Sequence, residues 1–164
     1  MNATAKAEER HTLDEAGKIF ARTLNGRVWQ LLERDGRSRE DDEEMLHAAH
    51  ASLFHWLSAG TGVNRQRGEW LIARVHTTLG NPTEALRHAS RCLELTDAHR
   101  DEMEGFDFAF AYESMGRANA LAGQRETSVE YRKRAEEAGK AISDPEDRKV
   151  FVDDFAGGDW YGIG

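Results

Sequence analysis

Histidine and cysteine side chains are the most reactive groups in the sequence, and two of the seven histidines have the spacing of metal ligands. His47 and His50 lie three residues apart, which would place both on one side of a helix. No third ligand is fixed by spacing, so we interpret both as structural and predict no metal site. The single cysteine, Cys92, lies four residues from His88, but nothing beside the pair would supply an oxyanion hole. We expect Cys92 to be a buried, small apolar residue.

A second group combines arginine with aromatic and acidic residues at helical spacing. Two triplets recur at steps of three and four residues: Arg67, Trp70 and Arg74, and then Phe110, Glu113 and Arg117. Each triplet would share one face of its helix. Trp70 could stack on Arg74, and Glu113 could form an ion pair with Arg117. The two triplets are therefore compatible with internal packing as well as with a ligand-binding surface.

A competing arrangement would gather titratable side chains in one enclosed pocket. Its members would be His47, His50, Arg67, Glu69, Asp107 and Glu113. Such a pocket would indicate a small-molecule-binding protein or a metal-dependent enzyme, and it would shift the pKa values of its carboxylates. The sequence has no glycine-rich phosphate loop, no metalloprotease motif and no serine nucleophile elbow. We therefore expect a protein without catalytic residues, cofactor or bound metal.

Composition narrows the classes of partner. The 164 residues carry a formal net charge of -8, which disfavours binding to nucleic acid or to an anionic membrane. One cysteine excludes an intrachain disulfide framework and favours a reducing, cytoplasmic location. The first 20 residues lack the apolar run of a signal peptide, and no window approaches 18 uncharged apolar residues.

Apolar residues recur every three to four positions along most of the chain, which predicts an all-α fold of six to seven helices. The predicted helices cover residues 12–35, 38–59, 65–79, 82–96, 106–122 and 125–142, with a short seventh beginning at 145. Thr12 and Ser38 are expected to cap the first two helices. Asn25 and Gly26 lie inside the first, where the helix could bend or break.

Two turns punctuate these helices in the same way. In LGNPTEAL, residues 79–86, Gly80 can adopt the left-handed conformation that ends a helix, and Pro82 suits the first turn of the next. LAGQRETS, residues 121–128, repeats this pattern with Gly123 in place of Gly80. Connections this short make the flanking helices antiparallel neighbours.

Aligning Gly80 with Gly123 also aligns the helices around them. The matched pairs are Ile72 with Met115, Ala73 with Gly116 and Ala85 with Ser128. This pattern resembles the tetratricopeptide repeat over residues 65–142, and more weakly over 12–60. Glu69 and His76 stand where that family usually has aromatic residues. The two glycines are 43 residues apart, a longer step than the ~34 of the commonest repeat.

The resemblance implies stacked helical hairpins in which the first helix of each pair lines a concave groove. It assigns to the groove Arg67, Trp70 and Arg74, together with Phe110, Glu113 and Arg117. Arginines beside aromatic rings suit an acidic or apolar segment. The implied function is noncatalytic binding of a protein or peptide. A homodimer formed through an end helix is a further expectation, because short stacks leave apolar end faces.

The chain divides into three predicted segments: a disordered N-terminus at 1–11, a single helical domain at 12–156 and a glycine-rich aromatic tail at 157–164. In the tail, Trp160 and Tyr161 are expected either to be disordered or to dock into the groove of the same or a neighbouring chain. Asp107 is expected to interact with the dipole of its helix or to accept hydrogen bonds from an arginine of the preceding unit, with Arg74 as the candidate.

Overall fold

Helices form almost everywhere that the sequence periodicity predicts them. The structure is a computed structural model that describes residues 10–163, and it contains no strand within that range. Its elements are α1 (Leu13–Leu32), α2 (Arg39–Ala59), α3 (Gly62–Thr78), α4 (Pro82–Ala98), a 3₁₀ turn (Arg100–Glu102), α5 (Gly105–Leu121), α6 (Arg125–Lys140) and α7 (Pro145–Ala156). The all-α prediction is confirmed.

Local capping explains where the first two helices begin. The Thr12 hydroxyl accepts from the Glu15 amide at 3.2 Å, and the Glu15 carboxylate accepts from the Thr12 amide at 2.8 Å. Ser38 and Asp41 make the same reciprocal pair of bonds before α2. The helix does not break at Gly26, because α1 continues through it from Leu13 to Leu32.

The two glycine turns have the same backbone geometry. Gly80 and Gly123 have φ angles of +73° and +74°, the left-handed region that glycine adopts without strain. After each glycine, the next amide donates back to a carbonyl in the last turn of the helix: Asn81 to His76 and Gln124 to Asn119, both at 2.9 Å. These bonds satisfy carbonyls that the helix end would leave unpaired.

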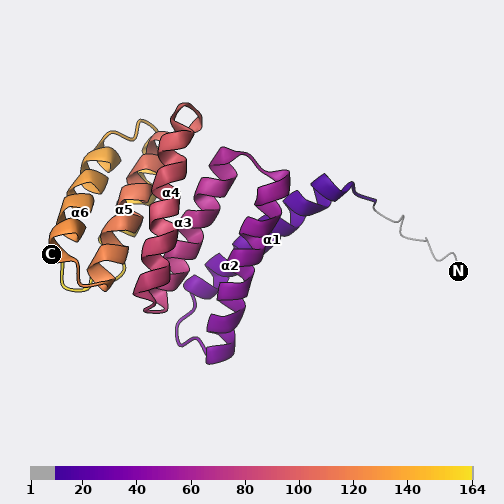
Figure 1. Ribbon diagram of the computed structural model, residues 1–164, viewed down its shortest axis with the longest axis horizontal. Coiled ribbons are helices and arrows are strands. Elements are labelled where there is room, and N and C mark those ends of the chain that lie inside the picture. The colour runs from indigo at the N-terminus through magenta and orange to yellow at the C-terminus, as the bar shows by residue number, and fades with distance from the viewer. Residues whose placement is uncertain (1–9, 164) are drawn as a thin grey trace, which may run out of the picture.

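Consecutive helices pack as hairpins, α1 with α2, α3 with α4 and α5 with α6, and the hairpins follow one another in chain order (Figure 1). Small side chains let α3, α4 and α5 approach closely, because their shared core is built from Ala73, Ala85, Ala89, Met115 and Ala118. The core between α1, α2 and α3 uses larger residues, including Leu31, Met45 and Ile72. Cys92 is fully buried in α4, and burial raises the pKa of its thiol.

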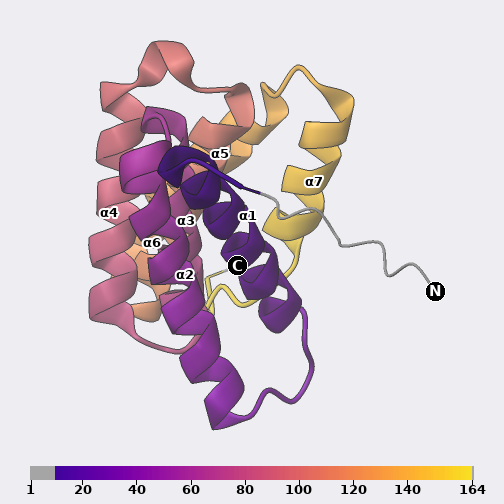
Figure 2. The same cartoon turned by 90° about the vertical axis from the view of Figure 1, so that its right-hand side faces the viewer.

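The seventh helix leaves the stack. Figure 2 shows α7 on the side formed by α1, α3 and α5, away from α4, and we call this side the inner face. Phe151 of α7 is buried against Gly139 of α6 and packs on the ring of Phe110 at 5.1 Å between centroids. The C-terminus of the chain therefore folds back over the helices that the repeat pattern assigns to a groove.

The tail docks on its own chain. Trp160 and Ile163 are buried, and the hydroxyl of Tyr161 donates to the carbonyl of Thr77 at 2.8 Å. The tail was expected either to be disordered or to dock on the same or a neighbouring chain. Up to residue 163 it docks on the same chain. The predicted disorder of residues 1–11 falls mostly on positions outside the described residues. Within the described range, no helix has the length and apolarity needed to cross a membrane.

Gly139 is the contact that seats α7 on α6. A side chain at this position would overlap the ring of Phe151, so we expect Gly139→Ala to destabilise the fold by about 1–3 kcal/mol. Gly26→Ala is the matched control, because Gly26 also lies inside a helix but has open space around it. The control should stabilise the protein by up to about 1 kcal/mol. Urea unfolding of both variants tests the contact, and a Gly139→Ala protein as stable as Gly26→Ala would contradict it.

Candidate functional site

The six predicted binding residues lie on α3 and α5, and the structure separates them into two environments. Arg67, Trp70 and Phe110 remain accessible at one end of the inner face. Arg74, Glu113 and Arg117 lie beneath α7 and the tail, where Glu113 is 1% exposed and Arg117 is 3% exposed. The tail therefore already covers half of the predicted groove.

The covered half is a cluster of buried charges that we call the Glu113 cluster: Arg74, Glu113, Arg117 and Asp154. Arg117 donates from Nε to the Glu113 carboxylate, and Arg74 approaches the same oxygen at 3.4 Å. Arg74 also makes two bonds to Asp154 of α7, at 2.8 and 2.6 Å. Burial raises the pKa of Glu113, while Arg117 and Arg74 act in the opposite direction. The two arginines favour the ionised carboxylate and so offset part of the cost of its burial.

Arg117 also holds the tail. Its guanidinium donates to the carbonyls of Asp154, Gly157 and Asp159 at 2.8–3.0 Å and lies 4.4 Å above the ring of Trp160. The expected pairing of Glu113 with Arg117 exists, but it is not at a helix surface. Helical spacing predicted the pair, whereas its burial depends on a chain segment about 40 residues further on, at Asp154–Asp159.

The expected pairing of Arg74 with Asp107 is wrong. Asp107 accepts two hydrogen bonds from Arg67 instead, at 2.8 and 3.0 Å, and its side chain is almost fully buried. The reason is register: Arg67 and Asp107 both lie near the start of their helices, while Arg74 lies two turns further along α3. Asp107 also accepts from the amide of Glu104 at 3.0 Å, so it caps α5 as well.

The accessible half of the inner face contains a pocket of about 320 Å³ between α1, α3, α5 and α7. We call it the aromatic pocket, and its walls are Asn25, Trp29, Gln66, Arg67, Trp70, Leu71, Phe106, Asp107, Phe110, Val150 and Asp154. The ring of Trp70 contacts both Trp29 and Phe110, with centroids 5.7 and 5.2 Å apart. Aromatic surface dominates this pocket.

Polar groups in the walls of the aromatic pocket are of two kinds. The ionised ones are paired within the chain, Arg67 with Asp107 and Asp154 with Arg74. Two neutral groups have no hydrogen-bond partner among the described residues: the side-chain carbonyl of Gln66 and the indole N–H of Trp70. The ionised groups of the pocket are therefore balanced within the chain, and the two unpartnered atoms are themselves buried.

The residues of the competing enzyme pocket do not meet in one place. His47 is exposed on α2. Arg67 and Asp107 lie in the aromatic pocket, and Glu113 lies in its own cluster. Glu69 contacts His88, whose ring is 5.4 Å from that of His50.

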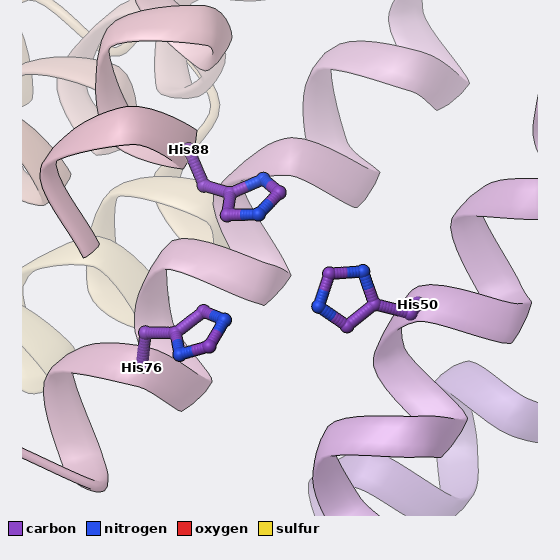
Figure 3. Close-up of side chains that lie close together, drawn as sticks. All are labelled: His50, His76 and His88. Carbon is purple, nitrogen blue, oxygen red and sulfur yellow. The ribbon is translucent and has the colours of Figure 1, made fainter. Parts of the chain in front are cut away.

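A histidine cluster joins α2, α3 and α4. His50, His76 and His88 point toward one another (Figure 3), and one nitrogen of each ring lies within 4.8 Å of the other two. Sequence reasoning grouped His50 with His47 and missed this arrangement. A usable signal was present, since His76 lies in the last turn of α3 and His88 in the second turn of α4, on either side of the short turn at Gly80.

Burial controls the charge of this cluster. It lowers the pKa of His76 to about 4 and also lowers that of His50, and the neighbouring His88 adds to both effects. His76 is therefore a neutral imidazole at neutral pH. One nitrogen of a neutral imidazole has a free lone pair. The neutral ring can therefore accept a hydrogen bond or bind a metal ion.

No family model, curated protein or solved structure matches this chain. Its function must therefore follow from its own geometry. Two arrangements of the described residues combine distinct chemistry with defined geometry: the aromatic pocket on the inner face and the histidine cluster between α2, α3 and α4.

Arg117→Ala tests whether the Glu113 cluster holds the tail. Removing this guanidinium leaves Glu113 under-compensated and frees three tail carbonyls, so we expect a loss of about 3–5 kcal/mol in the free energy of unfolding. Arg125→Ala is the matched control, because Arg125 also donates to the tail, at Gly162, but from an exposed position. Arg125→Ala should change the free energy of unfolding by no more than about 0.5 kcal/mol. Equal effects in urea unfolding would show that burial of the charge is unimportant.

Proposed function

We propose that the protein is a noncatalytic binding module, a tetratricopeptide-like stack of helical hairpins that binds a protein or peptide segment on its inner face. An apolar side chain of that segment would enter the aromatic pocket. The supporting observation is the pocket itself, an accessible hollow of about 320 Å³ walled by Trp29, Trp70, Phe106 and Phe110. Rigid aromatic walls of this kind are typical of pockets that receive an anchor side chain.

Two features of the hairpins support the likeness to the tetratricopeptide repeat. Successive pairs pack in chain order, and the two glycine turns share their φ angles and their hydrogen bonds. In such stacks the first helices of the pairs form one continuous surface. Here those helices are α1, α3 and α5, and each contributes wall residues to the aromatic pocket.

A peptide fits the aromatic pocket better than a cofactor does. Its volume lies at the small end of the about 300–1,000 Å³ typical of ligand sites, which suits one anchoring side chain. The same face already holds an irregular segment, because the tail buries Trp160 and presents its carbonyls to Arg117. The docked tail supports the proposal that the inner face binds irregular, aromatic sequence.

The charges of the pocket define the chemistry of the partner. Arg67 and Arg74 are already paired with Asp107 and Asp154, so an acidic partner gains little from them. The rings of Trp29, Trp70 and Phe110 offer the partner an apolar surface instead. The segment proposed here is therefore apolar, with an aromatic or branched aliphatic anchor.

Affinity selection from a displayed random-peptide library tests this function. The wild-type protein should enrich peptides that share one aromatic or branched aliphatic residue. Val150→Lys should lower the affinity for the selected peptides by about tenfold or more. Val150 is exposed at the pocket wall, and a lysine there brings a charge to an apolar surface. Fluorescence titration of a labelled peptide gives the dissociation constants.

Val152→Lys is the matched control. Val152 is also exposed on α7 but does not line the aromatic pocket, so peptide affinity should stay at the wild-type value. Two outcomes count against the proposal. One is a library in which no peptide is enriched over a protein-free selection, and the other is equal weakening by the two lysine variants.

A further inference from the structure

We propose that His50, His76 and His88 bind a zinc ion, with Glu84 as the fourth ligand. The three imidazoles come from three different helices and point toward one another (Figure 3). This site is separate from the aromatic pocket and shares no wall residue with it. It has the donor set that zinc prefers, imidazole nitrogen with carboxylate oxygen in four-coordinate geometry.

The ring nitrogens are close to coordination distance from a common centre. They lie within 4.8 Å of one another, and a tetrahedral site with Zn–N bonds of about 2.0–2.1 Å needs separations of about 3.3 Å. Zinc binding would draw the three nitrogens together by rotation of the side chains. His50 is exposed, so its ring can turn freely and the ion can enter from solvent.

An internal cation already occupies part of the site. The guanidinium of Arg87 lies 2.8 Å from Glu84 Oε2 and 2.8 Å from His88 Nε2. The same carboxylate oxygen is 4.0 Å from that imidazole nitrogen. Arg87 thus bridges the two atoms that a metal ion would take as ligands. Its side chain is 61% exposed on a flexible stem, so it can swing into water when another cation replaces it.

The surroundings of the rings match those of built metal sites. His88 Nδ1 lies 2.5 Å from the carboxylate of Glu69, a contact that fixes the ring and leaves Nε2 directed to the ion. Metal-bound histidines commonly have such a carboxylate behind them. His76 Nε2 is buried and has no hydrogen-bond partner among the described residues. A metal ion would satisfy this nitrogen, whose burial without a partner is otherwise a cost.

Zinc at this position would link the first two hairpins, because His50 belongs to α2 while His76 and His88 belong to α3 and α4. The expected role is structural. No step of the peptide-binding proposal depends on it, so either proposal can fail alone.

Titration of untagged, chelator-treated protein with zinc chloride tests the site. Calorimetry should show one ion per chain, and zinc should raise the melting temperature. His50→Gln removes a ligand, so it should lower the affinity for zinc by about tenfold or more. Because His50 is exposed, this variant should fold normally. His47→Gln is the matched control, since His47 is exposed on the same helix outside the cluster, and it should bind zinc as the wild type does.

Two further measurements separate a built site from adventitious binding. Cobalt(II) should give the intense visible absorption of a tetrahedral complex, and His50→Gln should abolish it. Arg87→Gln should raise the affinity for zinc about fivefold, because it removes a unit positive charge next to the ligands. The proposal is overturned if zinc does not bind, if His50→Gln and His47→Gln bind it equally, or if Arg87→Gln weakens it.

Discussion

The buried carboxylate of Glu113 is the charge around which the inner face is arranged. Burial without compensation would be too costly for this group, and two arginines, Arg74 and Arg117, supply the compensation. Both bring further donors into the interior, which need acceptors of their own. Asp154 and the carbonyls of the tail provide them. One acidic side chain on α5 is therefore linked, through its two arginines, to both α7 and the tail.

Local signals in the sequence predicted the helices well, whereas contacts between helices were predicted poorly. The caps at Thr12 and Ser38 and the turns at Gly80 and Gly123 depend on residues within a few positions, and all four formed as expected. The partner of Asp107 depends on the register of α3 against α5, which no local pattern encodes. The histidine cluster needs three helices in place at once, so spacing within α2 alone pointed to His47. Burial of Glu113 likewise requires the tail.

α3 presents different chemistry on its two sides. Arg67 and Trp70 face the aromatic pocket, while Glu69 and His76 face the histidine cluster. A helix is stiff over this length because its backbone bonds repeat at every residue. Any ion held by the histidines would thus restrain the same helix that forms a wall of the aromatic pocket. The two proposed sites therefore both depend on α3, although they have no residue in common.

The docked tail also has a consequence for the order of folding. The hairpins form from contacts close in sequence, but Arg74 meets Asp154 and Thr77 meets Tyr161 across 80 and 84 residues. Closing a long loop costs more entropy than closing a short one, so distant contacts form later. We expect the hairpin stack to assemble first, with Glu113 and its two arginines still open to water. During that interval the tail and any irregular segment of another chain compete for the covered half of the inner face, so docking of the tail protects that half from intermolecular association.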